Sequence, residues 1–400
     1  MRILFNGLTA LKPRTGIGQY CVHLANAAVK LLPGEFDIYP TPFVRTMVSR
    51  SMKLAGPKTA SQATTPSWKQ RVRGQITRTM KNLGQSATGV HFQRHCRASK
   101  AELYHEPNFL PFDVDVPTVI TVHDLSVLLY PQWHPADRVR QHQQKLKVAI
   151  RQAAHVITDT EQVKHEIVEQ LGIKATNITA VHLGVGPEFA PASEQDLLQT
   201  RKALSLPGRY FLCVGTIEPR KNLLTAMKAF AALPSTTREQ CPLLLAGPWG
   251  WRADAEREFY ERHGKAAGIR HLGYVPDAAL PSLFSGAVAL LYPSVYEGFG
   301  LPPLEAAACG TNIVCSAECA AVREVMGDRA TFVNADDVDG WRNAMQSLIE
   351  RGVLTPCVTL PRGVNTPRSG NQYSWQTTAQ QTIAVYEQVL GLTSSLRAAA

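Results

Sequence analysis

Features of several protein classes are missing from this 400-residue sequence. No apolar run approaches the roughly 20 residues that cross a lipid bilayer, so no membrane span is indicated. The eight cysteines include no Cys-x-x-Cys pair, so neither a zinc site nor a disulfide framework is indicated. The residues from Met1 to Phe5 lack the apolar core of a signal peptide, and we therefore expect a cytosolic protein.

Acidic side chains are absent from residues 38–101, a stretch that carries twelve Lys and Arg residues. The net charge of the whole sequence is +10, so this stretch holds more than the entire surplus. Such a block is often only a solvated surface, but it also suits anionic lipid head groups or a phosphate-bearing acceptor. Nucleic acid is a weaker candidate partner, because the stretch has few aromatic residues on which bases could stack.

What the sequence does contain is an alternation of short apolar runs and helix-length amphipathic segments. This alternation, in a chain too long for one compact core, predicts two α/β domains with parallel sheets. We expect domains at residues 1–190 and 191–370, followed by a helix within residues 371–392. Strands are predicted at residues 2–6, 103–107, 118–124, 181–186, 210–215, 243–247, 269–275, 287–292, 311–315 and 331–333.

Helix boundaries are predicted from capping residues and prolines. The first helix is expected from about Tyr20, after a turn-rich loop. Thr158 and Glu161 fit a capping box, and Asn222 is a suitable N-cap for a later helix. Three prolines and polar residues predict that residues 187–207 form an irregular connection.

The segment from Tyr296 to Glu305 places two carboxylates around a glycine-rich turn. An apolar run of strand length precedes it, and residues 302–308 form helix with prolines only in the first turn. A strand, a glycine loop and a helix N-terminus in series offer backbone N–H groups to an anionic or hydroxyl-rich ligand. On spacing alone, Glu305 could equally complement the helix dipole and Glu297 could be a solvated loop charge.

Polar residues also follow two other predicted strands. His123 and Asp124 end one strand, although an isolated His-Asp pair more often bonds locally than acts in chemistry. Arg220 and Lys221 lie at a strand-to-helix turn, where two cations suit a diphosphate and where surface charge is an equal alternative. The Gly16-Ile17-Gly18 loop lacks the full GxGxxG spacing, so dinucleotide binding is poorly supported.

Together these segments resemble retaining glycosyltransferases of family 4, most of all bacterial mannosyl- and rhamnosyltransferases. EGFGLPPLE, from Glu297 to Glu305, is similar to the family's E-x7-E motif. GTIEPRKNL resembles its phosphate-binding segment, and VHDLSVLLYPQWH resembles a stretch near its donor sugar. The resemblance covers nearly the whole chain and implies the GT-B fold, an α/β architecture of two Rossmann-like domains whose parallel sheets face a central cleft. In that fold the C-terminal helix packs back on the N-terminal domain.

The resemblance also implies roles for individual residues. Glu297 and the backbone after it would contact the transferred sugar, Glu305 the ribose, and His123 the sugar near its reacting carbon. The catalytic candidates are His123, Arg220, Lys221 and Glu297. The donor-binding candidates are Gly16, Gly18, Arg220, Lys221, Tyr274, Val275, Glu297, Phe299, Gly300, Leu301 and Glu305.

We therefore expect a retaining transferase that moves a hexose from a nucleoside diphosphate sugar to a glycan or lipid-linked hydroxyl. The resemblance favours GDP-mannose as the donor. Arg220 and Lys221 would stabilise the leaving diphosphate, and the site has no evident carboxylate pair for a metal, so no cofactor is expected. One alternative is a GT-B nucleotide-sugar epimerase, which would use the same phosphate site without an acceptor. Another is a basic lipid- or nucleic-acid-binding protein, which would not need the paired glutamates.

Overall fold

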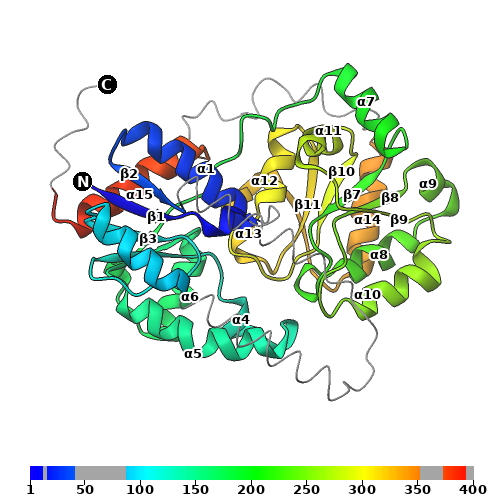
Figure 1. Ribbon diagram of the computed structural model, residues 1–400. Helices are drawn as coiled ribbons and strands as arrows, with labels where there is room; N and C mark the ends of the chain where they lie inside the picture. The colour runs from blue at the N-terminus through cyan, green and yellow to red at the C-terminus, as the bar shows by residue number, and fades with distance from the viewer. Residues whose placement is uncertain (12–15, 41–86, 352–372, 393–400) are drawn as a thin grey trace, which may run out of the picture. The chain divides into compact units, whose positions relative to one another are not determined.

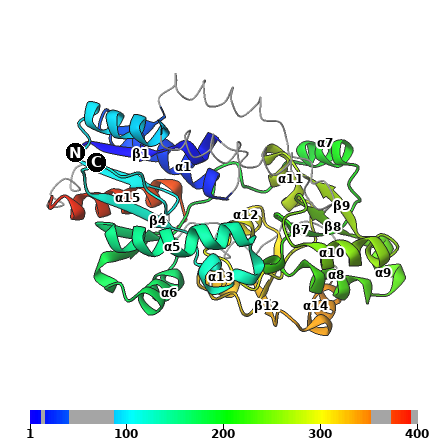
Figure 2. The same cartoon turned by 60° about the horizontal axis from the view of Figure 1, so that its bottom comes forward.

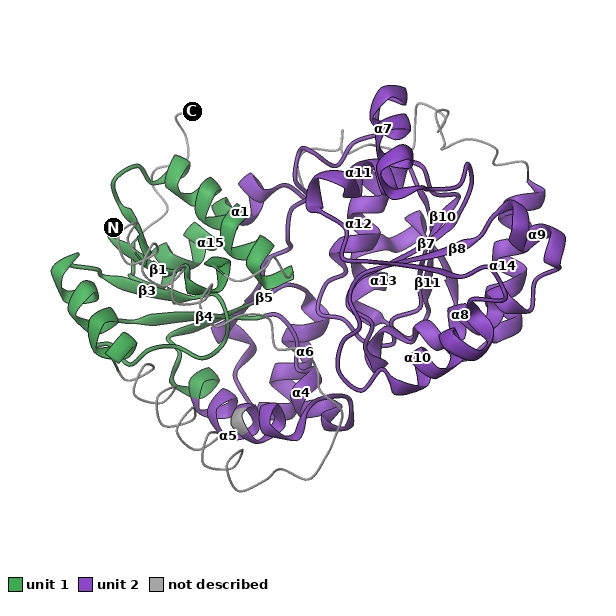
Figure 3. Cartoon of the chain, turned by 45° about the vertical axis from the view of Figure 1, so that its right-hand side comes forward, with its two compact units in different colours: residues 1–122, 149–157, 379–400 green, residues 123–148, 158–378 purple. Residues whose placement is uncertain are grey.

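The computed structural model describes residues 1–11, 16–40, 87–351 and 373–392. Most of the acid-free basic stretch lies outside the described residues, so its membrane role stays a prediction. The chain divides into two compact units (Figure 3). Unit 1 comprises residues 1–122, 149–157 and 379–400, and unit 2 comprises residues 123–148 and 158–378. The domain boundaries expected at residues 190 and 370 stay predictions.

The first six-stranded sheet has the order β2-β1-β3-β4-β5-β6. Its pairings of β1 with β2 and β3, and of β3 with β4, are parallel. β1 and β4 are mostly apolar, as expected for parallel strands buried on both faces, whereas β3 also carries the buried polar residues His105 and Glu106. The strands are β1 (Ile3–Asn6), β2 (Phe36–Tyr39), β3 (Leu103–Glu106), β4 (Thr118–Val122), β5 (His155–Thr158) and β6 (Ile178–Ala180).

The second sheet has the order β12-β11-β10-β7-β8-β9, and all of its pairings are parallel. The chain runs outward from β7 to β9 and then returns to the other side of β7 with β10. This reversal makes β7 and β10 the switch point of the sheet, where ligands bind beyond the carboxyl ends of strands in α/β folds. The strands are β7 (Phe211–Val214), β8 (Leu243–Ala246), β9 (Arg270–Gly273), β10 (Ala289–Tyr292), β11 (Asn312–Ser316) and β12 (Thr331–Val333).

Helices flank both sheets (Figures 1 and 2). On one face of the second sheet, α8 and α14 pack together and bury Phe230 and Trp341 with alternate residues of β7, β8 and β10. The period-2 alternation of these strand residues is what one face of a sheet requires. Among the described residues, no helix combines the length and apolar character needed to cross a membrane.

The α-helices with assigned bounds are α1 (Gly16–Leu31), α4 (Ser126–Leu129), α5 (Ala136–Gln152), α6 (Glu161–Leu171), α7 (Glu194–Leu204), α8 (Leu223–Ala231), α9 (Ser235–Gln240), α10 (Asp254–Phe259), α11 (Leu280–Ser285), α12 (Leu301–Ala308), α13 (Ala320–Met326), α14 (Val338–Glu350) and α15 (Trp375–Val389). Residues 87–98 are also helical. The final turns of α15 belong to unit 1, where the Tyr386 hydroxyl lies 2.6 Å from Nδ1 of His105 on β3.

Two predictions between residues 180 and 207 are wrong. The strand expected at residues 181–186 is absent, and β6 ends at Ala180. A side chain at Gly184 would lie 2.1 Å from the Trp375 backbone nitrogen, so this segment runs against the start of α15 instead of pairing in the sheet. The expected connection contains α7, because Ser193 caps a new helix by accepting a hydrogen bond from the Asp196 N–H at 3.2 Å.

Two helix starts and one capping bond also differ from prediction. α1 begins at Gly16, so both glycines of the Gly16-Ile17-Gly18 loop lie in its first turn. The N-cap of α6 is Thr160 rather than Thr158, since the Thr160 hydroxyl accepts from the Val163 N–H at 3.3 Å. Asn222 occupies the N-cap position of α8 as predicted, but its side chain donates to the Ala335 carbonyl at 2.7 Å and accepts from the Thr225 hydroxyl at 2.9 Å, and it accepts from no backbone N–H of the helix.

Candidate active site

The loops after β7 and β10 meet at the switch point of the second sheet. Arg220 and Lys221 lie in the 3₁₀ turn η4 (Pro219–Lys221) after β7, and Glu297 lies in the loop after β10. The Val295 N–H donates to the Arg220 carbonyl at 2.9 Å and ties the two loops together. Because β7 and β10 are paired neighbours, the sheet itself brings these distant segments side by side.

Glu297 is buried and paired with both cations. Its Oε1 accepts from Lys221 Nζ at 2.5 Å, and its Oε2 accepts from Arg220 Nη1. Arg220 Nε donates to the buried Glu218 at 2.5 Å, and Lys221 Nζ donates to the Tyr292 hydroxyl at 2.9 Å. Two cations and two carboxylates thus form one buried, neutral cluster.

The charges of this cluster hold one another ionised. Burial alone would raise the pKa of Glu297, but Arg220 and Lys221 outweigh it and bring the pKa to about 2. Burial likewise works to lower the pKa of Arg220, and Glu297 with Glu218 overcomes it and raises that pKa. At neutral pH Glu297 and Arg220 are therefore fixed charges, not proton donors or acceptors.

The glycines of the loop after β10 are required by close approach and by backbone conformation. A Cβ atom at Gly298 would lie 1.7 Å from the His123 carbonyl oxygen, so only glycine lets the two segments touch. Gly300 has φ 101°, a conformation that favours glycine, and α12 begins at the next residue, Leu301. The side chain of Phe299 is buried. The loop therefore presents its backbone beside His123.

His123 is itself held by a buried carboxylate. Its Nδ1 lies 2.7 Å from Asp159 Oδ2, and both residues are less than 10% exposed. Burial raises the pKa of Asp159, and the neighbouring His123 opposes that rise. The sequence pointed to Asp124 as the partner in a His-Asp pair, but the Asp124 carboxylate accepts from the Ser126 N–H and hydroxyl instead.

The remaining predicted residues are more dispersed. Glu305 lies in the first turns of α12, where burial and then the charges of Glu188 and Asp277 raise its pKa to about 8. Tyr274 and Val275 follow β9, the first 64% exposed and the second buried. Gly16 and Gly18 belong to unit 1, in the first turn of α1.

Several residues of this region were missed by sequence reasoning. Glu218 stands within the GTIEPRKNL segment, and its burial beside Arg220 could have been suspected from that spacing. Tyr292, Asp159 and Thr160 gave no comparable signal, because their contacts with Lys221, His123 and Gly298 join segments that are far apart in the sequence.

A metal centre finds no support in the described part of the chain. There, no three His, Cys, Asp or Glu side chains converge as metal ligands. The expected independence from metal ions stays a prediction.

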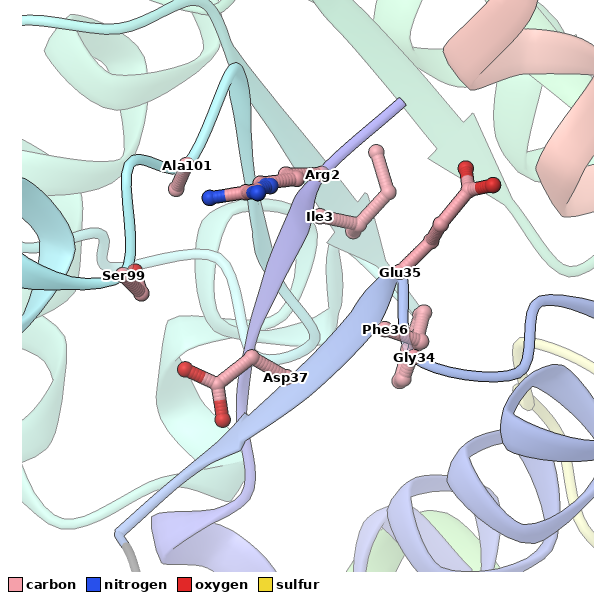
Figure 4. Close-up of a pocket in the computed structure, with 8 residues that line it drawn as sticks. All are labelled: Arg2, Ile3, Gly34, Glu35, Phe36, Asp37, Ser99 and Ala101. Atoms are coloured by element: carbon pink, nitrogen blue, oxygen red, sulfur yellow. The ribbon is translucent and has the colours of Figure 1, made fainter.

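A pocket of about 300 Å³ lies at the amino-terminal edge of the unit 1 sheet, lined by Arg2, Ile3, Gly34, Glu35, Phe36, Asp37, Ser99 and Ala101 (Figure 4). Two of its carboxylates already have partners. Glu35 pairs with the Met1 amino group at 2.9 Å, and Asp37 lies 2.7 Å from His95 Nε2. The pocket contains none of the predicted donor-binding residues.

The two parallel sheets define the class of fold, GT-B. HepE of Anabaena, solved in complex with UDP and glucose, has 16% identity and a TM-score of 0.64 over 97% of this chain and 100% of that structure. Sucrose-phosphate synthase of Thermosynechococcus elongatus has 19% identity and a TM-score of 0.68 over 98% and 99%. At such identities the likeness establishes the fold alone, and it confirms the predicted GT-B architecture.

Sequence comparison identifies the family. A model described as Glycosyltransferase Family 4 matches residues 15–189, and one described as Glycosyl transferases group 1 matches residues 196–355. O-antigen chain mannosyltransferase B of Escherichia coli is 36% identical over 294 residues, 73% of this chain and 75% of that protein. The serotype-specific mannosyltransferase WbdA of Escherichia coli is 26% identical over 282 residues, which cover 68% of this chain but only 34% of WbdA. The chain belongs to glycosyltransferase family 4, as its motifs predicted.

Proposed function

We propose that this glycosyltransferase is a retaining mannosyltransferase, which moves mannose from GDP-mannose to a hydroxyl of a glycan or lipid-linked acceptor in polysaccharide biosynthesis. The observation that carries the proposal is the buried cluster of Arg220, Lys221 and Glu297 at the sheet's switch point. Two relatives named as mannosyltransferases, one of them an O-antigen chain enzyme, support mannose as the sugar.

The cations of the cluster suit the departure of a nucleoside diphosphate. As the glycosidic bond breaks, negative charge grows on the diphosphate, and donors already in place stabilise it without reorganisation. Lysine has three N–H donors and arginine five. In the described residues, Arg220 Nη2 and one donor of Lys221 have no protein acceptor, so each cation can bind a phosphate oxygen and keep its carboxylate.

Glu297 suits the sugar side of the reaction as a fixed negative charge. Both of its oxygens are bound by cations, which makes them poor nucleophiles, so we propose that it positions and stabilises the sugar without forming a covalent bond. Retention would then follow from attack by the acceptor on the face that the diphosphate leaves.

A donor panel tests the proposal. The protein is incubated with GDP-mannose, UDP-glucose and other nucleotide sugars, together with mannose oligosaccharides as acceptors. Transfer from GDP-mannose with the anomeric configuration of the donor retained, read from one-bond C–H couplings of the product, is the expected result. Transfer only from a uridine sugar would overturn the donor assignment, and an inverted product would overturn retention.

Transfer should also survive excess chelator, because Arg220 and Lys221 supply the charge that a divalent ion supplies elsewhere. Activity that collapses with chelator and returns with magnesium or manganese would refute this. The epimerase alternative predicts isomerisation of the donor without acceptor, which the same reactions reveal. The cytoplasmic location and a peripheral contact of the basic stretch with anionic membranes remain predictions.

A further inference from the structure

The end of β5 supplies two consecutive buried residues to the candidate site, Asp159 and Thr160. Asp159 bonds the imidazole of His123, and the Thr160 hydroxyl donates to the Gly298 carbonyl at 3.0 Å. Their exposed fractions are 3% and 0%. One short segment of unit 2 therefore holds both the imidazole and the glycine loop.

The contact from Asp159 decides which nitrogen of His123 carries a proton. An ionised carboxylate can only accept a hydrogen bond, so an ionised Asp159 assigns the hydrogen of the 2.7 Å contact to Nδ1 of His123. In a neutral imidazole, Nε2 then has the lone pair and is the hydrogen-bond acceptor of the ring. The partner of one ring nitrogen thus fixes the role of the other.

The contact from Thr160 decides where a backbone amide points. The peptide bond between Gly298 and Phe299 is planar, and the carbonyl and N–H of a trans peptide point in opposite directions. Because the Gly298 carbonyl is fixed on Thr160, the Phe299 N–H is directed away from β5. Phe299 is a buried residue, and in the described part of the chain its N–H meets no protein acceptor, which marks it as a donor available to a ligand.

We propose that Asp159 and Thr160 are positioning residues of the donor-sugar site, Asp159 by fixing the tautomer of His123 and Thr160 by aiming the Phe299 N–H at the transferred sugar. The inference rests on the proposed function, since it assigns the sugar to this loop. It adds that neither residue touches the sugar and that both act through groups that do.

Thr160 is tested with a pair of variants and a stability control. Thr160→Val keeps the shape but removes the hydroxyl, and kcat should fall about 10- to 100-fold, less than the 100- to 1,000-fold typical of deleting a preorganised donor outright. Thr160→Ser keeps the hydroxyl and should restore kcat to within about threefold. The hydroxyl also caps α6, so Ser193→Ala, which removes the matching cap of α7, shows what loss of a cap does by itself.

Asp159 is tested by the NMR spectrum of the imidazole. In Asp159→Asn, the amide can donate to Nδ1, and the ¹⁵N shifts of His123 should move toward the tautomer protonated at Nε2, with kcat reduced about 10-fold or more. Asp37→Asn is the matched control, because Asp37 also bonds a histidine at 2.7 Å and lies in unit 1. That variant should leave both the His123 shifts and kcat unchanged.

Outcomes for the inference and for the proposed function are separable. Turnover is measured with whichever donor the panel identifies, so a donor other than GDP-mannose refutes the mannosyltransferase proposal and leaves the Thr160 comparison decisive. The His123 shifts need no turnover. Unchanged His123 shifts in Asp159→Asn, or a Thr160→Val enzyme as fast as Thr160→Ser, would overturn the positioning roles. A folded Thr160→Ser enzyme as slow as Thr160→Val would do the same.

Discussion

Each sheet has a buried glutamate at its switch point. In unit 2, Glu297 follows β10, which pairs with β7. In unit 1, Glu106 ends β3. This strand pairs with β1 on the side opposite to β2. The strand arrangement therefore places a carboxylate at the same topological position twice.

The partners of the two glutamates differ, and so does their chemistry. Glu106 accepts from neutral groups, Asn6 Nδ2 at 2.6 Å, the Tyr104 hydroxyl at 2.5 Å and the Asn108 N–H at 3.0 Å. Burial outweighs these donors and raises the pKa of Glu106 to about 7, whereas two cations bring Glu297 to about 2. The strand order thus places both glutamates, and the side chains beside each one determine whether its carboxylate is ionised at neutral pH.

The contrast between Glu297 and Glu106 loses its functional meaning if the cations paired with Glu297 are not needed for turnover. Lys221→Ala should lower kcat by roughly 100- to 1,000-fold, with a smaller change in donor KM, because the lost bond strengthens as the diphosphate leaves. Steady-state kinetics on purified protein measure both constants. Lys265→Ala is the matched control, since Lys265 forms an exposed ion pair with Glu261 and should have no effect on turnover. Near-normal transfer by folded Lys221→Ala protein would refute the phosphate assignment.

Stability against pH tests the comparison directly. The pKa of Glu106 lies above the ordinary 4.5, so stability falls as pH rises from about 4.5 to 7. The pKa of Glu297 lies below 4.5, so its stabilisation is present above pH 4.5 and is lost as pH falls toward 2. Each shift corresponds to roughly 3 kcal/mol.

Thermal unfolding of Glu106→Gln and Glu297→Gln across both windows separates the two effects. Relative to the unchanged protein, Glu106→Gln should flatten the slope between pH 4.5 and 7, and Glu297→Gln should flatten the slope below 4.5. The comparison is wrong if both variants alter the same window, or if neither alters a slope.

A smaller effect is expected from Arg220→Lys, which keeps the charge at the switch point of unit 2. Arg220 donates from Nε to Glu218 and from Nη1 to Glu297, and an ammonium cannot reproduce this planar arrangement. We expect kcat to fall about 10-fold, between the unchanged enzyme and Arg220→Ala. Kinetics of the three forms side by side decide the point, and equal activity of Arg220→Lys and the unchanged enzyme would show that charge alone suffices.

Much of the fold follows from the sequence. Buried apolar runs predicted β7, β8 and β10 within two residues of their ends, because parallel strands covered on both faces are continuously apolar. The helix α7 was missed because three prolines between residues 187 and 207 suggested a connection. Its signal was present in Ser193 and Asp196, a capping pair.

The site was less predictable than the fold. The motifs singled out Arg220, Lys221 and Glu297, but their mutual contact depends on the pairing of β7 with β10, which no local pattern encodes. The capping box was assigned to Thr158 and Glu161, and Asp159 between them was given no role, because its contact with His123 depends on the pairing of β4 with β5. Local patterns predict elements, whereas contacts between strand ends require the sheet order.

The smallest effect is expected at Glu305, the other charged residue of the motif in unit 2. Its pKa of about 8 means that it is largely protonated at neutral pH before the nucleotide binds. Ribose hydroxyls donate hydrogen bonds to an ionised carboxylate. The esterified diphosphate of GDP-mannose does not titrate in this range. Affinity for GDP-mannose should therefore rise with pH and level off above pH 8. Glu305→Gln should raise donor KM less than 10-fold with kcat unchanged, because a ribose contact is equal in ground and transition states.

Calorimetric titrations of GDP-mannose between pH 6.5 and 9 measure this dependence, and Glu305→Gln should bind with no pH slope. Glu188→Gln sharpens the test. Removing that neighbouring charge should lower the pKa of Glu305 and move the plateau of affinity to lower pH, since Glu188 is among the causes of the raised value. A large fall in kcat for Glu305→Gln with unchanged donor KM would contradict the ribose assignment. It would instead place the Glu305 side chain at the reacting sugar, the role proposed for Glu297.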